Sequence, residues 1–580
     1  MMKRIIIAIL LIAILLIVGK KDTFASFERI DQINNKFGIH LAVVSEEDLQ
    51  DAASLVNSQG GDWGYVTVVI EEKDRNLEKW QSAFDKMREL HLIPIVRLAT
   101  SMEGSNWRAP KTEDAKDWAD FLDSLNWVVK NRYIVLFNEP NHAKEWGGKI
   151  DPASYGQVAL GLARKLKEKN PDFFVMLAGF DAAAPHKLPD FEDEELFLHK
   201  MFVSLPNWGQ ELISLMDGWA SHSYPNHGFV GSPYGWGRNS IRTYLWEINF
   251  LKRFNIGDDL PVFITETGWP HNEGINLHRG YYSQKQVAGN FRLLFIQLPS
   301  DPKIVAITPF ILNYQSDLFD QFSWRKPGSR EFYLQFETVR QLAKIKGEPR
   351  QEQKLTVMEK LPQKLVRGST YQINLRVKNE GQAIWSQKED YHLDLVNAPL
   401  DLNYFFSDFG KLGPGEETVM RLHLKTPENL AKLSLSLAVT KNTQAVSNQY
   451  PWSLEVLPAP SLKFNVAAFP KIKTSGDDFK ILLYNEQNEV VFEKDNVGVR
   501  NGQGAVEEVN NLAIETKYRV VILKPYYLPR QEFLVFQEGQ NQITFKPMLP
   551  LDFNRDGKLS FVDLFTIFIK PRLARLWWSI

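Results

Sequence analysis

The sequence predicts an α/β fold, a (β/α)8 TIM barrel followed by two β-sandwich domains and a short C-terminal EF-hand-type calcium loop. Three observations support this prediction. Strand-like apolar runs alternate with helical stretches eight times between residues 37 and 346, short alternating runs follow residue 353, and a calcium-loop pattern lies near the C-terminus. Strict alternation indicates a parallel sheet, and eight units close into a barrel. The rival, a doubly wound open sheet, needs a Gly-rich phosphate loop that "IHLAVVSEED" does not provide.

Eight short apolar runs are predicted to be the barrel strands. Buried strands of parallel sheets appear as near-continuous apolar runs bounded by turn residues. The predicted strands lie at residues 37–44, 64–70, 92–100, 133–140, 173–183, 216–225, 261–270 and 304–312.

A stretch with helical periodicity follows each predicted strand. In residues 76–90, apolar side chains recur at intervals of three and four, which is typical of an amphipathic helix. The predicted helices lie at residues 45–60, 76–90, 114–129, 152–170, 191–215, 240–254, 283–298 and 330–345. Together with the strands they define a predicted catalytic barrel over residues 30–348.

Composition limits the classes of protein that the chain can belong to. Its 580 residues exceed one hydrophobic core, and three or four domains are expected. A net charge of −2 gives no reason to expect a nucleic-acid partner. The absence of cysteine excludes disulfides, zinc–thiolate sites and thiol nucleophiles.

Residues 1–26 are predicted to be a signal peptide or a membrane anchor. The basic "MMKR" precedes "IIIAILLIAILLIV", which is longer than a core strand and shorter than an ordinary membrane span. Cleavage after Ala25 and retention as an anchor flanked by Lys20 and Lys21 both stay open. We therefore expect an exported protein, extracellular or at the cell surface.

Two predicted strands end in a glutamate. "VLFNEP" places Glu139 at the end of the fourth strand, and "FITETGWP" places Glu266 at the end of the seventh. These ends face each other across the barrel mouth, where active sites of such barrels lie. Glycosidic cleavage needs two carboxylates in one cleft, one to protonate the leaving oxygen and one to attack the anomeric carbon. A salt bridge at the barrel end is the alternative role for either residue.

Three strand ends together resemble those of the clan A glycoside hydrolases, such as families 5, 17 and 39. "NEP" ends the fourth strand at residues 138–140, and "ITETGWP" at 264–270 is similar to the nucleophile segment of the family 17 β-1,3-glucanases. "HSY" at 222–224 resembles the His-x-Tyr of family 5. The resemblance is limited to the barrel, and it implies a retaining glycosidase.

The resemblance also implies a role for each matched residue. Glu139 would be the general acid/base, and Glu266 would be the nucleophile. Asn138 would hold the sugar 2-hydroxyl, and Tyr224 would orient Glu266. His222 would line the sugar site or bond to the acid, with a buried core histidine as the alternative.

Further residues near the strand ends are candidates for binding substrate. Arg97 ends the third strand and would pair with Glu266 or form a structural ion pair, whereas His40 is expected to be structural. Tryptophans in loops would stack on sugars or pack within the protein: Trp63, Trp107, Trp269, Trp146, Trp236 and Trp324. The eighth strand departs from the clan pattern, because Phe310 and Tyr314 stand where many members have a tryptophan.

The sequence changes character after residue 353. Residues 353–457 alternate with period two and resemble Ig-like accessory domains. Residues 461–548 resemble a small carboxypeptidase-regulatory-like or transthyretin-like sandwich, and "PAPS" before them is typical of a linker. Either domain would act as a spacer or bind carbohydrate.

Residues 549–580 contain the calcium loop and a tail. "DFNRDGKLSFVD" offers oxygens at loop positions one, three, five, nine and twelve, a backbone carbonyl at seven and a glycine at six. The predicted Ca2+ ligands are Asp552, Asn554, Asp556, Lys558, Ser560 and Asp563. The loop resembles one dockerin repeat, but dockerins carry two. The sequence therefore favours a calcium-stabilised cap over a loop that binds a cohesin partner.

The sequence thus predicts an exported retaining O-glycosyl hydrolase that acts on a β-linked polysaccharide or oligosaccharide. The metal would be structural, since the carboxylate pair needs no cofactor. Two alternatives stay open: a cell-surface glycan-binding or adhesion protein without turnover, and a transglycosylase that uses the same two glutamates.

Overall fold

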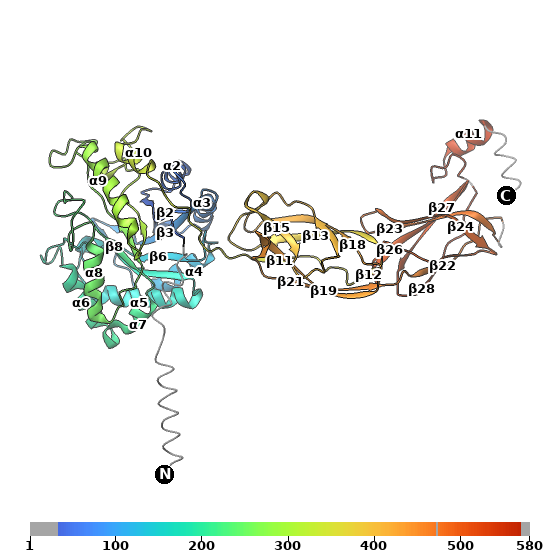
Figure 1. Cartoon of the computed structure of the whole chain (residues 1–580), viewed down its shortest axis with the longest axis horizontal. Coiled ribbons are helices and arrows are strands. Elements are labelled where there is room, and N and C mark those ends of the chain that lie inside the picture. The colour runs from blue at the N-terminus through green and yellow to red at the C-terminus, as the bar shows by residue number, and fades with distance from the viewer. Residues whose placement is uncertain (1–32, 471–473, 551, 570–580) are drawn as a thin grey trace, which may run out of the picture. The chain divides into compact units, whose positions relative to one another are not determined.

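The structure is a computed structural model that describes residues 33–470, 474–550 and 552–569. The chain forms two compact units, Met1–Glu352 and Gln353–Ile580 (Figure 1). The predicted signal peptide or anchor at residues 1–26 lies outside the described residues. Within the described ranges, no helix has both the length and the apolar character needed to span a membrane.

Eight parallel strands form a closed ring in the first unit. They are β1 (Gly38–His40), β2 (Gly64–Glu71), β3 (Leu92–Ala99), β6 (Arg132–Leu136), β7 (Phe173–Leu177), β8 (Trp219–His222), β9 (Val262–Glu266) and β10 (Ile304–Ile307). Pairing follows the orders β1-β2-β3-β6-β7 and β8-β9-β10. Parallel bridges between Phe37 and Ile307 and between Met176 and Gly218 join the two sheets. The α/β prediction is confirmed for this unit, and the ring has the strand connectivity of a (β/α)8 barrel.

Helices follow the strands in alternation (Figure 1). They are α2 (Glu46–Val56), α3 (Leu77–Glu89), α4 (Asp114–Ser124), α5 (Pro152–Lys169), α6 (Glu194–Ser204), α7 (Gln210–Leu215), α8 (Thr243–Leu251), α9 (Gln284–Gln297) and α10 (Leu334–Arg340). Short 3-10 turns are η2 (Glu72–Asp74), η3 (Ala143–Glu145), η4 (Pro206–Gly209), η5 (Lys252–Phe254), η6 (Leu298–Ser300) and η7 (Asp320–Phe322).

Side-chain caps fix several helix starts. The Ser45 side chain accepts a hydrogen bond from the Asp48 N–H at the start of α2. At the start of α9, Ser283 and Gln286 form a reciprocal capping box. Such caps satisfy backbone donors that the first helical turn leaves unpaired, and they fix where each loop over the barrel mouth ends.

The barrel core is continuous between the strands and the helices. All five residues of β7 are buried, as expected for a strand covered on both faces. On α3, Trp80, Phe84 and Met87 are buried on one face and belong to the same core cluster. This packing holds the carboxyl ends of the strands, where the candidate site lies, in fixed positions.

The loop after β3 carries a small hairpin, β4 (Met102–Glu103) paired with β5 (Asn106–Trp107). The Gly147 N–H donates to the Trp107 carbonyl at 2.7 Å, which ties this hairpin to the loop after η3. The contact brings loops from the third and fourth barrel strands together at the same side of the mouth.

The second unit is built of β-sheets. Its strands are β11 (Leu355–Val357), β12 (Lys364–Val366), β13 (Thr370–Asn379), β14 (Trp385–Ser386), β15 (Tyr391–Leu395), β16 (Asn403–Phe406), β17 (Lys411–Leu412), β18 (Glu417–Lys425), β19 (Ala431–Lys441), β20 (Gln444–Ala445), β21 (Tyr450–Leu457), β22 (Ser461–Asn465), β23 (Gly476–Tyr484), β24 (Val490–Arg500), β25 (Gln503–Val506), β26 (Lys517–Lys524), β27 (Tyr527–Val535) and β28 (Gln540–Thr544). A 3-10 turn, η8 (Gln387–Glu389), and the C-terminal helix α11 (Phe561–Ile569) complete it.

Two hydrophobic cores lie within this unit. The sheets β11-β13-β18-β16 and β12-β21-β19-β15 enclose the first core, as expected for a sandwich. Seven strands, β27-β26-β23-β24-β25-β22-β28, form one hydrogen-bonded sheet around the second. The two cores adjoin, since the Tyr371 hydroxyl donates to the Leu512 carbonyl at 2.9 Å. The predicted second sandwich is therefore a single continuous sheet that curls around its own core.

Candidate active site

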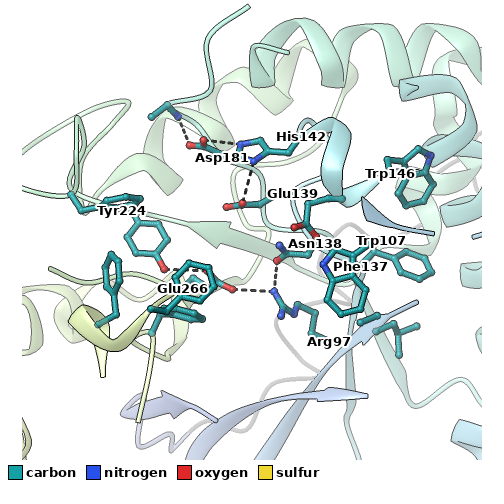
Figure 2. A pocket seen from close by; sticks show the side chains of 18 of the residues that line it. Arg97, Trp107, Phe137, Asn138, Glu139, His142, Trp146, Asp181, Tyr224 and Glu266 are labelled. Carbon is teal, nitrogen blue, oxygen red and sulfur yellow. Dashed lines mark hydrogen bonds and ion pairs between the residues drawn. The ribbon is translucent and has the colours of Figure 1, made fainter. Parts of the chain in front are cut away.

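A cleft of about 390 Å³ opens at the carboxyl ends of the barrel strands. Glu139 and Glu266 line it from opposite sides, and both side chains point into it (Figure 2). The other lining residues are Arg97, Leu98, Ala99, Thr100, Trp107, Pro110, Phe137, Asn138, His142, Glu145, Trp146, Asp181, Ala183, Tyr224, Asn226, Phe229, Tyr281, Phe310, Phe319, Gln321 and Phe322.

Glu266 ends β9 and is held by two hydrogen bonds. Arg97 donates from Nη1 to Glu266 Oε1 at 3.1 Å, and the Tyr224 hydroxyl donates to Oε2 at 3.1 Å. His40 Nε2 lies 3.9 Å from Oε1, and His222 Nδ1 lies 3.9 Å from Oε2. The carboxylate is thus fixed at both oxygens by side chains from β1, β3 and the end of β8.

These contacts determine the charge of Glu266. Burial raises the pKa of Glu266, but His222, Arg97, His40 and the Tyr224 hydrogen bond together outweigh it, and the net pKa is lowered. Burial and the neighbouring Glu266 charge raise the pKa of Tyr224, which keeps its proton for donation. Glu266 is therefore an ionised carboxylate at neutral pH.

Glu139 follows β6 on a tight turn. Phe137 and Glu139 both have positive φ, 71° and 30°, which is uncommon for residues with side chains. The Glu139 N–H donates to the Gly179 carbonyl at 3.1 Å, and the His142 N–H donates to the Glu139 carbonyl at 2.9 Å. The turn ends the strand and directs the Glu139 side chain across the cleft.

His222 connects the two carboxylates. Its Nδ1 lies 2.8 Å from Glu139 Oε1, within hydrogen-bond distance. Burial lowers the pKa of His222, but the nearby carboxylates of Glu266 and Glu139 raise it by a larger amount. The net pKa is therefore above the ordinary value. Space for the ring comes from Gly179, since a Cβ there would lie 2.1 Å from His222 Cδ2.

The two carboxylates lie close together in the cleft. One ligand atom each of Glu139, His222 and Glu266 lies within 4.8 Å of the others. Carboxyl groups about 5–5.5 Å apart are typical of retaining enzymes, whereas inverting enzymes need about 6.5–9.5 Å for a water molecule. The two carboxylates therefore reach the same small region of the cleft.

The same three residues are the one group in the described part of the chain whose donor atoms cluster as metal ligands do. Two of these atoms are already engaged. His222 Nδ1 bonds Glu139, and the Arg97 guanidinium contacts Glu266. A fixed positive charge in contact with a donor atom opposes a cation, so the donor set fits a metal poorly.

Arg97 and Asn138 form the floor of the cleft. Arg97 Nη1 donates to Asn138 Oδ1 as well as to Glu266. The predicted pairing of Arg97 with Glu266 is present, and Arg97 also lines the cleft.

The sequence analysis did not single out three residues that line the cleft: His142, Glu145 and Asp181. His142 Nε2 lies 2.9 Å from Asp181 Oδ2, and His142 Nδ1 lies 3.9 Å from Glu139 Oε2. Glu145 lines the cleft beside Asn138, and burial with the Glu139 charge raises the pKa of Glu145 to about 7. The available signal was the polar run "NEPNHAKEW" after a barrel strand, since loops there carry function.

Two of the predicted sugar-binding tryptophans lie outside the cleft. Trp269 is 1% exposed, and its Nε1 donates to the Gly231 carbonyl, so it is a core residue. Trp63 precedes β2 at the opposite end of the barrel from the glutamates and stacks on His91. The prediction that these two bind substrate is wrong, because loop position alone does not show which way an indole faces.

The remaining tryptophans divide in the same way. Trp107 and Trp146 line the cleft (Figure 2). Trp324 is fully buried, and Trp236 is exposed and stacks on Arg242 outside the cleft lining. Of the two tryptophans that line the cleft, Trp146 is buried and Trp107 is only partly buried.

Aromatic side chains form one wall of the cleft. Tyr224, Phe229, Phe310 and Phe322 pack edge-to-face with ring centroids 5.0 to 6.1 Å apart. Phe310 follows the eighth barrel strand, β10, as the sequence indicated, and its ring is part of this wall. His40 packs on Phe310, and burial lowers the pKa of His40 to about 3. His40 is therefore neutral at neutral pH. It was expected to be structural, and its Nε2 lies 3.9 Å from Glu266 Oε1.

The predicted calcium loop has a defined conformation. Asp563 accepts from the N–H groups of Phe553, Asn554 and Ser560, and Asp552 Oδ2 accepts from the Gly557 N–H. Gly557 has φ +78°, which suits the sharp turn at position six. Asp552 Oδ1 is buried with no hydrogen-bond partner in the described residues. A cation would satisfy this orphaned oxygen, so the donor set fits Ca2+.

No family model matches the sequence, and no curated protein matches it. Among solved structures, the chain is similar to an endo-β-1,3-glucanase of family GH128 from Pseudomonas viridiflava, with 13% identity, 53% of this chain and 97% of that chain covered, and a TM-score of 0.35. A glucosidase from Croceicoccus marinus has 11% identity, coverages of 83% and 93%, and a TM-score of 0.38. An endo-β-1,4-glucanase from Xanthomonas axonopodis pv. citri has 12% identity, coverages of 53% and 98%, and a TM-score of 0.35.

Replacing Gly179 with alanine tests the placement of His222. The added Cβ must displace the ring, so we expect Gly179→Ala to lower the free energy of unfolding by about 1–3 kcal/mol. The titration of His222, followed by NMR, should also shift because its contact with Glu139 is lost. Gly161→Ala on α5 is the control, since its Cβ would meet only Thr112 at 3.9 Å. Equal stability and an unchanged titration in Gly179→Ala would contradict the packing of the His222 ring against residue 179.

Proposed function

We propose that the protein is a retaining glycoside hydrolase that cleaves β-linked polysaccharides or oligosaccharides by double displacement. The observation that carries the proposal is the pair of carboxylates facing each other within 4.8 Å in a single cleft. Glu266, ionised and fixed at both oxygens, is the nucleophile. Glu139, on the opposite side, is the general acid and then the general base.

The reaction takes place in two steps. Glu266 attacks the anomeric carbon while Glu139 protonates the leaving oxygen, which forms a covalent glycosyl–enzyme ester and releases the aglycone. Glu139, now a carboxylate, removes a proton from water, and that water displaces Glu266 and restores both side chains. The Arg97 and Tyr224 hydrogen bonds stabilise Glu266 as a leaving group in the second step.

The environment of Glu139 suits an exchange of protons. His222 Nδ1 lies at hydrogen-bond distance from one oxygen, and His142 lies 3.9 Å from the other. Two imidazoles beside one carboxyl group provide alternative sites for the proton that Glu139 must give and take. His142 is itself anchored by Asp181, whose hydrogen bond contributes to the raised pKa of His142 against the effect of burial.

The cleft wall supports a sugar substrate. Aromatic rings contact the apolar faces of sugars, and Trp107, Phe229 and Phe322 all line the cleft. Polar groups that fix orientation are few and convergent, as in small-ligand sites generally. Asn138 lines the cleft and would bond the sugar 2-hydroxyl, a contact that strengthens in the transition state.

The two alternative functions are a glycan-binding protein without turnover and a transglycosylase, and each needs a different arrangement of site residues or products. A glycan-binding protein has no need for an ionised carboxylate held at both oxygens opposite a second one, so the arrangement favours turnover. A transglycosylase would use the same residues, and analysis of products formed with an added sugar acceptor separates it from a hydrolase.

We place the protein outside the cytoplasm, exported or held at the cell surface by residues 1–26. The proposal rests on the sequence of that segment. The β-sheet unit would act as a spacer or as a glycan-binding region, and a cohesin-type partner for the C-terminal loop remains a secondary proposal.

Activity assays on glycan panels test the enzymatic proposal. We expect the protein from residue 26 onward to release sugars from at least one of β-glucan, mannan, xylan and galactan. Glu266→Ala should lose about 10³-fold or more of kcat, because the nucleophile is removed. Glu139→Ala should lose about 10²- to 10⁴-fold, and much less on aryl glycosides whose leaving group needs no proton.

Glu103→Ala is the matched control, because Glu103 is an exposed residue of the hairpin after β3. It should retain wild-type rates. Binding of a glycan by the wild-type protein without any turnover would refute the enzymatic proposal and support the binding protein.

We also propose that residues 552–563 bind one structural Ca2+ through Asp552, Asn554, Asp556, the Lys558 carbonyl, Ser560 and Asp563. Titration of CaCl2 into the metal-free protein, followed by calorimetry, should give one site. Asp552→Asn should remove it, and the exposed Asp401→Asn should leave it unchanged. Absence of a binding heat at millimolar CaCl2 (about the range of extracellular sites) in the wild-type protein would refute the calcium site.

A further inference from the structure

The loop between β8 and α8 carries two strongly exposed aromatic side chains. Trp236 is 73% exposed, and Tyr234 is 60% exposed. Trp236 is the most exposed tryptophan in the described part of the chain. A single exposed apolar side chain is normal on a protein surface, but two aromatic rings on one loop are a candidate binding surface.

Hydrogen bonds within this loop fix its shape around Trp236. The Gly235 N–H donates to the Ser232 carbonyl at 3.0 Å and closes a turn. The Ser240 hydroxyl donates to the Gly237 carbonyl at 2.7 Å. The backbone on both sides of Trp236 is therefore held, and the loop presents the indole from a defined position.

Arg242 supports one face of the Trp236 ring. Its guanidinium carbon lies 4.6 Å from the ring centroid, within the range of a cation–π contact. Arg242 is only 8% exposed, and it donates to the Gly235 carbonyl at 3.0 Å and to Gln297 Oε1 at 2.7 Å, so the support is itself anchored. Because Trp236 stays largely exposed despite this contact, the face opposite Arg242 lies open to solvent. A planar ring with one face held and the other free offers a surface for the apolar face of a sugar.

The loop is continuous with the catalytic cleft at both ends. Asn226 and Phe229, near its start, line the cleft. Near its end, Arg238 donates from Nε to the Ala182 carbonyl at 2.8 Å, and the residues on either side of Ala182 line the cleft. Trp236 stands two residues before Arg238 and outside the lining, which places it at the rim of the cleft.

The contacts of this loop indicate the leaving-group side of the cleft. Asp181, next to Ala182, lies 2.9 Å from His142, and His142 lies 3.9 Å from Glu139. Glu139 is the proposed acid that protonates the leaving oxygen, so the leaving sugar unit lies on this side. A glycan chain that continues beyond the leaving unit would pass toward the rim that carries Trp236.

We propose that Trp236 is a sugar-binding platform at the rim of the cleft, which takes a unit of the glycan chain on the leaving-group side of the cleaved bond. This inference rests on the proposed function, and it assigns the substrate to chains that extend beyond the cleft rather than to disaccharides. The free face of the indole contacts the apolar face of the sugar, and Arg242 holds the ring in place. Trp236 lies outside the cleft lining, so it contributes binding and takes no part in the chemical steps.

The dependence of the rate on chain length tests the platform. The probes are the oligosaccharides, from disaccharide to hexasaccharide, of the glycan that the wild-type protein hydrolyses, together with the 4-nitrophenyl monoglycoside of its sugar. We expect Trp236→Ala to lower kcat/KM about threefold to tenfold on the hexasaccharide. The loss should appear mainly in KM, since a remote contact is equal in the ground state and the transition state. It should shrink with chain length and be least on the monoglycoside, which has no sugar on the leaving-group side.

Further variants separate sugar stacking from a structural cover over Arg242. Trp236→Met keeps an apolar cover but removes the planar ring, so it should lose as much on the hexasaccharide as Trp236→Ala. Trp236→Tyr keeps a ring and should recover part of the loss. Trp208→Ala is the matched control, because Trp208 is 58% exposed on η4 and outside the cleft lining, and it should match the wild type on every substrate. Unfolding temperatures of all variants show whether a loss comes from misfolding.

The outcomes are distinct. A loss in Trp236→Ala and Trp236→Met that grows with chain length would support the platform. An equal loss on every substrate, the monoglycoside included, or an unchanged KM of Trp236→Ala for the hexasaccharide, would overturn it while the proposed function stands. A wild-type protein that hydrolyses no glycan of the panel would overturn the proposed function, and this inference with it.

Discussion

The pairing of Arg97 with Glu266 is the interaction on which the rest of the site depends. An ionised carboxylate that is 8% exposed and close to a second carboxyl group is costly unless a positive charge accompanies it. Arg97 supplies that charge from β3, and the same nitrogen fixes Asn138. Loss of this guanidinium would leave the buried Glu266 with only the Tyr224 hydrogen bond and the nearby His222 and His40 rings, and it would also release the Asn138 amide.

The closed ring makes this arrangement possible. Arg97, Glu139, His222 and Glu266 come from four strand ends that are far apart in the sequence, and the parallel pairing brings these ends to one mouth. Each strand is buried by helices on one side and by the barrel interior on the other, which restricts its side chains to fixed positions. Glycine at residue 179 contributes by its lack of a side chain, because the His222 ring occupies that space.

The sequence was informative where chemistry coincides with a strand end. Glu139 and Glu266 each close an apolar run, so their place at the barrel mouth followed from the pattern alone. Glu145 could not be found in this way, since its place in the cleft and its burial are created only by the folded loop. Trp63 and Trp269 failed for the converse reason: a loop position does not show whether an indole faces the cleft or the core.

Trapping of the covalent intermediate tests the central claim most directly. A 2-deoxy-2-fluoro glycosyl fluoride slows both steps but slows breakdown of the ester more when its leaving group is good, so the intermediate accumulates. Mass spectrometry of the digested protein should then find one fluoroglycosyl group, attached to the peptide that contains Glu266. Attachment to another carboxylate, or continued turnover of the reagent without any adduct on the wild-type protein, would contradict the account.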